Sequence, residues 1–329
     1  MEYFIFLNPE HEPGDDPRAR LDGHVRQVVA AQELGFSGVA VGQHLSTEGF
    51  QWFPPIPLLS YLASAAPGMR FGTSILALPF FHPVLVAEAM AFIDVATNGR
   101  SFFGAASGWS ESEFKTLGIE RSRRRTRLVE GLEIVRRLWT EDGVTFAGKE
   151  YQLDNVTLSL RPIQKPRPPI WMGASTEKMA REAAAISDAL VYSSHPPLSV
   201  LETLSHAYND ERTKLGLGPP AEVPVLRNCF VGETYDEAVA TALPYLQASY
   251  AGFFSDHIDG VLRIEKQDDA LLDRVILGGP QDVIDGIRRV REKLGATAIV
   301  FRMQWQGMPD TLVDRAIRIL GEQVLPHVD

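Results

Sequence analysis

Short runs rich in β-branched and aromatic residues alternate along this chain with longer runs whose apolar residues recur at helical spacing. Tyr3–Leu7 is the first short run, and Leu21, Val25, Val28 and Val29 mark one face of the helical run after it. A parallel sheet has this rhythm, because a helix usually carries the chain back to the start of each next strand. The pattern therefore predicts βαβ units.

The alternation predicts eight strands, at residues 3–7, 38–42, 70–78, 101–105, 169–173, 189–193, 225–232 and 297–303. Eight strand–helix units close most simply into a (β/α)₈ TIM barrel, an α/β fold. A length of 329 residues also allows two domains. Because a barrel can absorb the whole chain, we predict a single domain over residues 1–329.

Two segments are longer than the bare repeat requires. Residues 144–168 are typical of a hairpin followed by a proline-rich connector, and residues 245–276 form a long, aromatic insertion of mixed charge. Long segments inside a compact domain are often lids or binding loops. We therefore expect a lid near 245–276, with the substrate entrance beside it.

Composition excludes several classes of function. The chain is 45% hydrophobic and 22% charged, has a net charge of −10, and contains one cysteine, Cys229. A single cysteine excludes a disulfide framework, an iron–sulfur cluster and a thiolate zinc site, and the negative charge argues against a nucleic-acid partner. There is no cleavable apolar leader, and prolines interrupt the longest uncharged stretch at 49–69, so we expect a cytoplasmic protein without a membrane segment.

Candidate site residues are the polar side chains expected where the strands end, since barrels of this type place their chemistry there. They are Asn8, His44, Thr73, Ser74, Ser107, Ser175, Thr176, Ser193, Ser194, His195, Arg302 and Gln304. His44 could act as an acid, a base or a hydrogen-bond donor near neutral pH, or be an ordinary loop histidine. No cluster has a tight metal-ligand spacing, so no metal site is predicted.

Two further features have both a structural and a functional interpretation. The turn containing Ser175 and Thr176 leaves a strand through glycine and enters a helix, so it could bind a phosphate, or Ser175 could simply cap the helix. The arginine-rich run at 121–127 is typical of a solvated helix start with acidic partners, but Arg127 could instead help to hold a cofactor phosphate.

Several short motifs occur in one order along most of the chain. They are ELGFSGVAVGQH at 33–44, FGTSILALPFFHP at 71–83, IDVATNGRSFFGAASGW at 93–109, GLEIVRRLW at 131–139, RP at 161–162 with PPIWMGAS at 168–175, and LGGPQDV at 277–283. In this combination the chain resembles the bacterial luciferase-like family of flavin-dependent monooxygenases and oxidoreductases, which are (β/α)₈ barrels.

The resemblance implies roles for particular residues. His44 matches a histidine that assists flavin–oxygen chemistry, and Ser74-Ile75 matches a non-proline cis peptide under the flavin ring. Ala106-Ser107 matches the segment beside the flavin, and the turn at 174–176 matches the one that binds its phosphate. The predicted cofactor-binding residues are Thr73, Ser74, Ala106, Ser107, Ala174, Ser175, Thr176 and Ser193.

Two departures from the family pattern affect the expected chemistry. The family's frequent Glu-His-His after the second strand is Gln43-His44-Leu45 here, so that carboxylate and the second histidine are missing. Luciferases proper can also place an arginine at the position of Ser107, where it meets the phosphate. We therefore expect no light emission, and a phosphate that depends more on backbone N–H groups and hydroxyls.

The resemblance leaves three functions open. The first is a two-component monooxygenase that accepts reduced FMN from a separate flavin reductase and oxygenates a small organic substrate with O₂. The second is hydride transfer with the deazaflavin coenzyme F420, and the third is a flavin-binding protein without turnover, which the departures at Gln43 and Leu45 keep open. The family is commonly dimeric near its second and third strands, and the apolar segment 50–62 offers a face for a homodimer.

Overall fold

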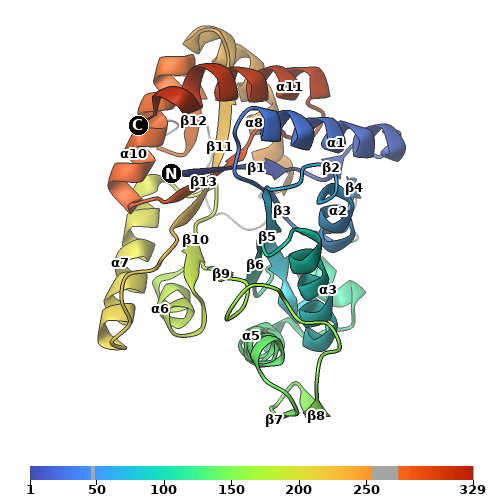
Figure 1. The fold of residues 1–329 in the computed structure, drawn as a ribbon. Coiled ribbons are helices and arrows are strands. Elements are labelled where there is room, and N and C mark those ends of the chain that lie inside the picture. Colours follow the sequence, from blue (N-terminus) through green and yellow to red (C-terminus); the bar gives the residue numbers. More distant parts are fainter. Residues whose placement is uncertain (46–48, 254–272, 329) are drawn as a thin grey trace.

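The structure is a computed structural model that describes residues 1–45, 49–253 and 273–328, and within them a sheet of nine parallel strands carries the fold (Figure 1). The strands are β1 (Glu2–Leu7), β3 (Gly38–Val41), β5 (Arg70–Ala77), β6 (Ser101–Ala106), β9 (Ile170–Gly173), β10 (Ala189–Val191), β11 (Pro224–Val231), β12 (Val275–Gly278) and β13 (Ala298–Arg302). The predicted α/β class with a parallel sheet is confirmed.

Helices connect these strands. They are α1 (Pro17–Glu33), α2 (Pro55–Leu62), α3 (Pro83–Ala96), α4 (Glu111–Thr116), α5 (Arg124–Thr140), α6 (Glu177–Ile186), α7 (Leu198–Lys214), α8 (Tyr235–Phe253), α10 (Pro280–Leu294) and α11 (Asp310–Ile319). Local chemistry sets the bounds of α1, since the Asp16 side chain accepts the N–H of Arg18, Pro17 stands at the first helical position, and Gly35 adopts a φ of +84° just after the end.

The sheet curls, and its order is β10-β9-β6-β5-β3-β1-β13-β11-β12. Asn228 of β11 pairs with both Val275 and Arg302, so β12 and β13 flank opposite edges of β11. On the edge shared with β12, Val225 forms a parallel bridge with Tyr192, the residue after β10. Two backbone hydrogen bonds of Tyr192, 2.9 and 3.2 Å long, support this bridge. The described residues contain no longer ladder between β10 and β11.

Alternate residues of β1 face two different cores. Successive side chains of a strand point to opposite faces, so Tyr3, Ile5 and Leu7 pack in the outer core with the helices, whereas Phe4 and Phe6 belong to a smaller inner core. Both sets are buried. The continuous apolar run of this strand is therefore explained by burial on both faces.

The inner core ends in a plug of aromatic rings and one arginine near the starts of the strands. Phe102 stacks on Trp171 with 4.0 Å between ring centroids, and the guanidinium of Arg70 lies over both rings. Arg70 also pairs with Glu2 and Glu222. These contacts fill the N-terminal end of the curled sheet and leave the opposite end for a site.

The eight predicted strands are all present, with bounds shifted by at most two residues. The prediction for 245–276 was partly wrong, because residues 245–253 continue α8 and β12 occupies the end of the segment. Pro244 lies inside α8, although a proline in a helix interior normally kinks or ends the helix. The lid expected within 254–272 lies outside the described residues.

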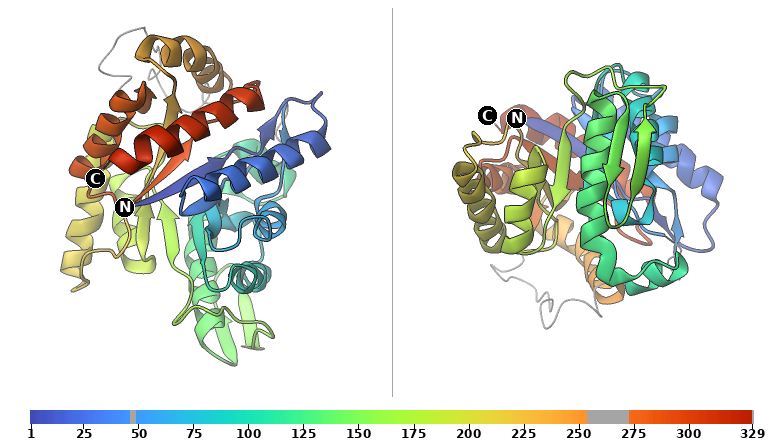
Figure 2. Two further views of the ribbon diagram at one scale, coloured as in Figure 1. Left: turned by 45° about the horizontal axis from the view of Figure 1, so that its top comes forward. Right: turned by 90° about the horizontal axis from the view of Figure 1, so that it is seen from below.

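Two short antiparallel pairs lie outside the main sheet. The predicted hairpin is confirmed as β7 (Val144–Ala147) and β8 (Gln152–Val156), which lie beside α5 (Figure 2). The pair β2 (Glu10–His11) and β4 (Gln51–Trp52) was not predicted, because two-residue strands leave no periodic signal.

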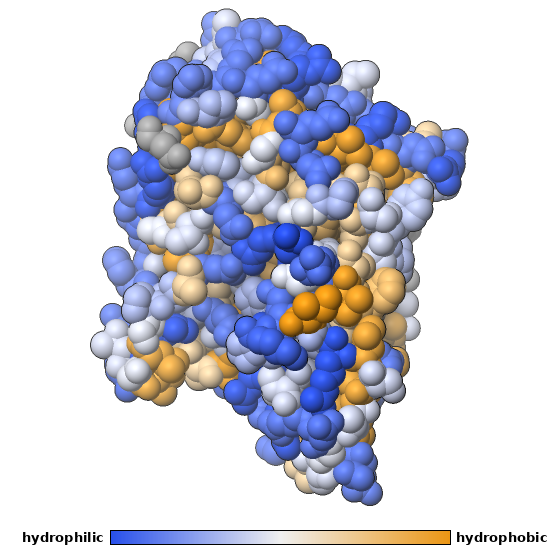
Figure 3. All heavy atoms as spheres, viewed as in Figure 1, coloured by the Kyte–Doolittle hydropathy of each residue, from blue (hydrophilic) through white to orange (hydrophobic). Residues whose placement is uncertain are grey.

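Exposed apolar side chains gather on α3 (Figure 3). Leu85 and Phe92 are 63% and 51% exposed, and Val95 is also exposed. Within segment 50–62, where a dimer face was expected, Leu58, Leu59 and Leu62 of α2 are core residues that pack inward, whereas Tyr61 is 47% exposed. The hydrophobic face that remains in this region belongs to α3.

Candidate active site

The C-terminal ends of the parallel strands bring the predicted site residues to one end of the sheet. Asn8 follows β1, His44 follows β3, Ser74 lies late in β5, Ser107 follows β6 and Ser175 follows β9. Parallel strands all end at the same rim, so side chains from distant parts of the sequence meet there. We refer to this end of the sheet as the rim.

His44 has the most completely defined surroundings at the rim. Its Nδ1 lies 3.3 Å from Oε1 of Glu113 in α4. Two indole rings contact the imidazole edge-on, Trp52 at 4.8 Å and Trp109 at 5.8 Å between ring centroids. The side chain is 16% exposed. The carboxylate and the aromatic rings therefore hold the imidazole in one orientation, with Nε2 on the side away from Glu113.

Glu113 is a site residue that sequence reasoning missed. Its side chain is 4% exposed, its Oε1 also accepts the N–H of Leu45 at 2.6 Å, and Ser110 caps α4 beneath it. Although Gln43 stands where the family often has glutamate, His44 thus has a carboxylate partner from another element. The Ser110-x-x-Glu113 pattern predicts a helix start, but nothing in it points to a histidine far away in the sequence.

The end of β5 departs from regular strand geometry. The Ser74–Ile75 peptide is cis, as the family resemblance implied, and the register with β6 shifts between Thr73 and Leu76. The buried hydroxyl of Thr73 donates to the carbonyl of Gly104 at 2.7 Å and accepts its N–H at 3.1 Å. Thr73 therefore fastens β5 to β6, and its hydroxyl is engaged by this neighbouring strand.

The turn after β9 has the geometry of a helix start. Oγ1 of Thr176 accepts the N–H of Met179 at 3.3 Å, so Thr176 rather than Ser175 caps α6. Ser175 is exposed and Ala174 is buried. Backbone N–H groups at a helix start together with an exposed hydroxyl suit a phosphate. The capping role considered for Ser175 is thus performed by its neighbour.

A hydrogen-bonded chain crosses the rim from β10 to the segment after β1. Oγ of Ser193 lies 3.1 Å from Nδ1 of His195, whose Nε2 lies 3.4 Å from Arg302. Arg302 also pairs with the buried carboxylate of Glu10 at 3.4 Å. Burial, with the positive charge of Arg302, holds the pKa of His195 well below its ordinary value. His195 is therefore a neutral imidazole at neutral pH.

Several buried polar atoms at the rim have no hydrogen-bond partner within the described part of the chain. They are Oδ1 of Asn8, Nε1 of Trp52, Oγ of Ser74, Oγ of Ser194 and Oε1 of Gln304. Each such atom costs about 1–3 kcal/mol when it stays unpaired, and native structures contain few of them. Their concentration at one end of the sheet indicates that a polar-edged ligand or ordered water meets them there.

A cavity of about 320 Å³ opens beside His44. It is lined by Gln43, His44, Leu45, Phe50, Trp52, Pro54, Pro55 and Phe81. Most of these side chains are apolar, and the polar groups are confined to Gln43, His44 and the indole nitrogen of Trp52. The volume is at the lower end of the range for small-molecule sites. We call this space the His44 cavity.

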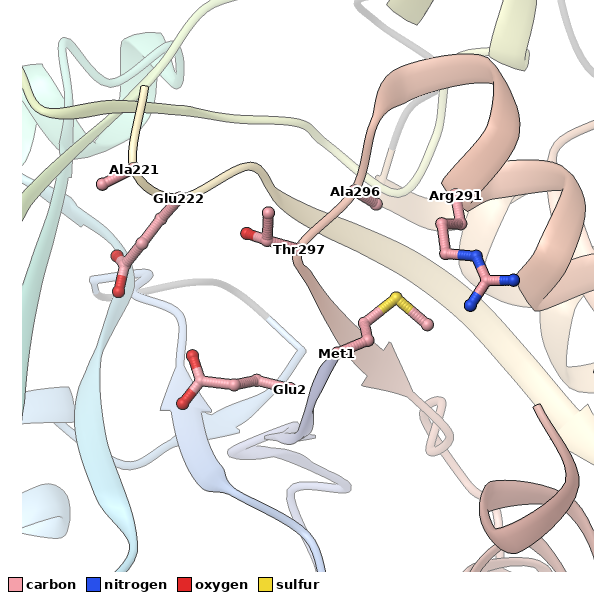
Figure 4. Close-up of a pocket in the computed structure, with 7 residues that line it drawn as sticks. All are labelled: Met1, Glu2, Ala221, Glu222, Arg291, Ala296 and Thr297. Carbon is pink, nitrogen blue, oxygen red and sulfur yellow. The ribbon is translucent and has the colours of Figure 1, made fainter. Parts of the chain in front are cut away.

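A larger hollow of about 590 Å³ lies at the opposite end of the strands (Figure 4). Met1, Glu2, Glu222 and Arg291 are among the residues that line it. Its two carboxylates both pair with Arg70 and so belong to the plug of the inner core. Because residues at this end of such folds serve stability rather than catalysis, we assign the candidate active site to the rim.

The arginine-rich run at 121–127 lies against acidic side chains. Arg123 and Arg127 contact Glu150 at 2.7 and 3.6 Å, and Arg125 pairs with Glu182 at 2.5 Å. Arg127 also donates to a backbone carbonyl. These contacts agree with the interpretation as a helix start with acidic partners and give Arg127 a structural role.

The described residues give no support for a metal site or for a reactive thiol. No group of three histidine, cysteine or acidic side chains there could hold a metal ion. Cys229 is buried in β11, as predicted for a core residue, and burial raises the pKa of its thiol. Among the described helices, none combines the length and the apolar character needed to cross a membrane.

The fold and the rim agree with what the comparison with known families shows. Residues 1–298 match the model of the luciferase-like monooxygenase family. The chain belongs to this family. Family membership confirms the resemblance seen in the motifs and identifies the protein as an oxidoreductase.

Similar proteins within the family include both monooxygenases and an F420-dependent dehydrogenase. Monooxygenase RslO1 from Streptomyces bottropensis has a crystal structure that superposes with a TM-score of 0.87, at 26% identity and with both chains covered in full. Limonene 1,2-monooxygenase of Rhodococcus erythropolis is 23% identical over 99% of this chain and 86% of its own. The F420-dependent glucose-6-phosphate dehydrogenase of Nakamurella multipartita is 32% identical over 57% of each chain.

Proposed function

We propose that this member of the luciferase-like monooxygenase family is a two-component monooxygenase that takes reduced FMN from a separate flavin reductase and oxygenates a small organic substrate with O₂. The observation that carries the proposal is the His44–Glu113 pair beside an apolar cavity at the rim. Over the whole chain, monooxygenase RslO1 superposes with a TM-score of 0.87, compared with 0.80 for an F420-dependent secondary alcohol dehydrogenase.

The rim residues fit the ring of a flavin. An isoalloxazine has one edge of carbonyl and ring-nitrogen groups, and such an edge needs donors and acceptors. The unpaired buried atoms of Asn8, Ser74, Ser194 and Gln304 supply both kinds. We assign the positions beside the ring to Thr73 and Ser74 on β5, and to Ala106 and Ser107 after β6.

The turn before α6 fits the phosphate. We assign the phosphate to Ala174, Ser175 and Thr176, with Ser193 of the adjacent strand end as a further hydroxyl. Backbone N–H groups at the start of α6 add the favourable end of the helix dipole. Position 107 is a serine rather than an arginine. In this assignment the hydroxyls and backbone N–H groups therefore make most of the contacts with the phosphate.

When bound, reduced FMN supplies the electrons that activate O₂, so that one oxygen atom enters the substrate and the other leaves as water. His44 is proposed as the catalytic residue, holding or donating a proton through Nε2 beside the His44 cavity. Glu113 is a positioning residue, since its carboxylate lies 3.3 Å from Nδ1 and fixes the orientation of the ring. Phe50 and Phe81 exclude water from the cavity.

The second candidate is hydride transfer with coenzyme F420, which the 32% identity to the F420-dependent dehydrogenase favours. The His44–Glu113 pair would serve that chemistry as a proton carrier as well. A flavin-binding protein without turnover, the third possibility, would show no product formation for His44→Ala to lower.

The proposal also covers the closure of the barrel and the oligomeric state. The Tyr192–Val225 bridge joins the residue after β10 to β11, and we interpret it as the closure of a (β/α)₈ barrel that makes residues 1–329 a single domain. We further propose a homodimer through α3, because Leu85 and Phe92 are large apolar side chains left more than half exposed.

Oxygen uptake tests the proposed reaction. The protein is mixed with FMN, a flavin reductase, a reduced nicotinamide and a candidate substrate, and oxygen consumption is compared with product formation. The proposal predicts that one oxygen atom from ¹⁸O₂ appears in the product and that His44→Ala lowers product yield about 100-fold or more. Turnover of F420 without oxygen consumption would assign the protein to the second candidate.

A further inference from the structure

The indole nitrogen of Trp52 is a buried donor at the wall of the His44 cavity. It has no hydrogen-bond partner among the described residues, and Trp52 lines the cavity beside His44, with 4.8 Å between the two ring centroids. A buried N–H that stays unpaired is costly, and tryptophan can only donate. A molecule with an accepting atom at this wall would remove that cost.

The wall that carries Trp52 is held in place by β4. Gln51, its neighbour, donates from Nε2 to three backbone carbonyls, those of Glu12, Pro13 and Asp15, each at 2.9 Å. Trp52 itself pairs with Glu10 in the β2–β4 ladder, and the N–H of the next residue donates to a carbonyl after β1. The indole is therefore presented from an anchored backbone, which is the arrangement a specific contact needs.

Gln43 provides a second donor to the same cavity. Its Oε1 accepts the N–H of Ala77 at 2.8 Å, and because a backbone N–H can only donate, the amide oxygen is the atom that faces Ala77. The NH₂ group remains as the polar end that Gln43 offers to the cavity it lines. The cavity thus has two donors from neutral side chains within otherwise apolar walls.

The walls exclude other kinds of occupant. Among the described residues that line the cavity, those other than His44 have uncharged side chains, and the carboxylate of Glu113 beside His44 also accepts the N–H of Leu45. An ionised substrate would lose its hydration without gaining a partner of opposite charge. A volume of about 320 Å³ suits a compact molecule of one or two rings.

We infer that the His44 cavity selects an uncharged, mainly apolar ring compound with a carbonyl oxygen, and that Trp52 is the residue that determines this specificity by donating to that oxygen. This inference rests on the proposed function, since it names the substrate class of the same site. Binding of such a compound would place its carbonyl beside His44.

Three ring compounds of nearly equal size test the inference by calorimetric titration of the full-length protein. They are cyclohexanone, methylenecyclohexane, which replaces the oxygen by CH₂, and cyclohexanecarboxylate. We expect cyclohexanone to bind about 10-fold more tightly than methylenecyclohexane, a factor typical of one satisfied donor, and the carboxylate to bind more weakly than both. Equal binding of ketone and hydrocarbon, or no detectable ketone binding, would overturn the inference.

Trp52→Phe removes the N–H while keeping an aromatic ring. The ratio of ketone to hydrocarbon affinity should fall to within about 3-fold of one in this variant. Trp109→Phe is the matched control, because that indole also contacts His44 edge-on but does not line the cavity, and it should keep the wild-type ratio. A preference that survives Trp52→Phe would show that another group recognises the oxygen.

The titrations are made both without flavin and, anaerobically, with reduced FMN. These two conditions separate the substrate preference of the cavity from the proposed function, which requires binding of reduced FMN. A ketone preference that depends on Trp52, in a protein that does not bind reduced FMN, would support the cavity assignment and contradict the proposed function. Binding of reduced FMN together with equal ketone and hydrocarbon affinities would support the proposed function and contradict the cavity assignment.

Discussion

His44 gains its proposed role from its surroundings. The imidazole is oriented by Glu113, screened by Trp52 and Trp109, and placed beside an apolar cavity. An isolated loop histidine would lack these neighbours and could adopt several rotamers. At the scale of residues, the proposed role therefore belongs to the His44–Glu113 pair rather than to His44 alone.

Glu113→Gln tests the pair. The amide keeps the shape and can still accept the N–H of Leu45, but it removes the carboxylate that lies 3.3 Å from Nδ1 of His44. We expect product formation to fall about 10- to 100-fold, with affinity for reduced FMN changed less than about 3-fold. Steady-state turnover and a flavin titration measure the two effects. Glu113→Asp should recover part of the activity, and equal turnover in all three proteins would refute the role.

Two buried histidines make stability depend on pH. Burial lowers the pKa of His11 to about 3 and that of His24 to about 4, and their Nε2 atoms lie 3.1 Å apart. In the unfolded chain both have a pKa near 6.5, so the unfolded state binds more protons between pH 6.5 and about 4. The free energy of unfolding should therefore fall as pH falls through this window.

Urea denaturation at pH 7, 6 and 5 measures this effect. Each histidine contributes a slope of at most about 1.4 kcal/mol per pH unit near pH 5. His24→Asn should make the pH dependence shallower by up to that amount, while lowering stability at pH 7. An unchanged slope in the variant would mean that His24 is already protonated in the folded protein.

Sequence reasoning at this scale found the residues at strand ends but not their partners. His44, Ser74 and Ser175 were placed correctly at the rim, since position in a parallel strand follows from local pattern. Glu113 and Trp52 were missed, because each meets His44 through contacts that the chain makes only after folding. The capping residue Thr176 was mistaken for its neighbour, since both are hydroxyl side chains.

The contact between β5 and β6 is the element on which the rim depends most closely. Thr73 binds both backbone groups of Gly104, and a Cβ added at Gly104 would meet the carbonyl oxygen of Thr73 at 2.1 Å. A methyl group there forces the two strands apart. The bulge next to the cis peptide at Ser74 would then shift, together with the positions assigned to the flavin ring.

Gly104→Ala should destabilise the protein by about 2–4 kcal/mol, since overpacking against backbone cannot be relieved by a rotamer change. Chemical denaturation measures the change, and reduced-FMN affinity should fall in parallel. Gly218→Ala is the control, because nothing lies within 4 Å of the added Cβ, and it should change stability by less than about 0.5 kcal/mol. Similar stability of the two variants would contradict the close approach.

Elements were predictable where the pattern is local and periodic. The strands and the hairpin followed from runs of β-branched and aromatic residues. The continuation of α8 through Pro244, the strand β12 and the two-residue pair β2–β4 were missed, because their formation depends on neighbours that the sequence does not display. The β2–β4 pair matters most, since it holds Trp52 at the cavity.

At the scale of the whole molecule, one end of the sheet is packed with side chains and the other end carries the candidate active site. The starts of the strands are filled by the plug around Arg70, Phe102 and Trp171. Their ends carry unpaired polar atoms, a cavity and the His44–Glu113 pair. The outer surface adds an apolar face on α3, so assembly and chemistry are assigned to different parts of the molecule.

Phe92→Glu tests the proposed dimer. A charge in the centre of the α3 face should weaken self-association at least 10-fold, because it would be buried without a partner. Sedimentation equilibrium measures the dissociation constant. Leu217→Glu is the control, since Leu217 is similarly exposed, at 43%, but lies after α7. A monomeric wild-type protein, or a dimer that tolerates Phe92→Glu, would contradict the assignment.

The central claim is that the rim binds reduced FMN. An anaerobic equilibrium titration with oxidised FMN, reduced FMN and coenzyme F420, side by side on the full-length protein, tests it most directly. The account predicts that reduced FMN binds at least 10-fold more tightly than coenzyme F420, and that Ser175→Ala combined with Ser193→Ala weakens this binding. Tight binding of F420 with no binding of reduced FMN would contradict it.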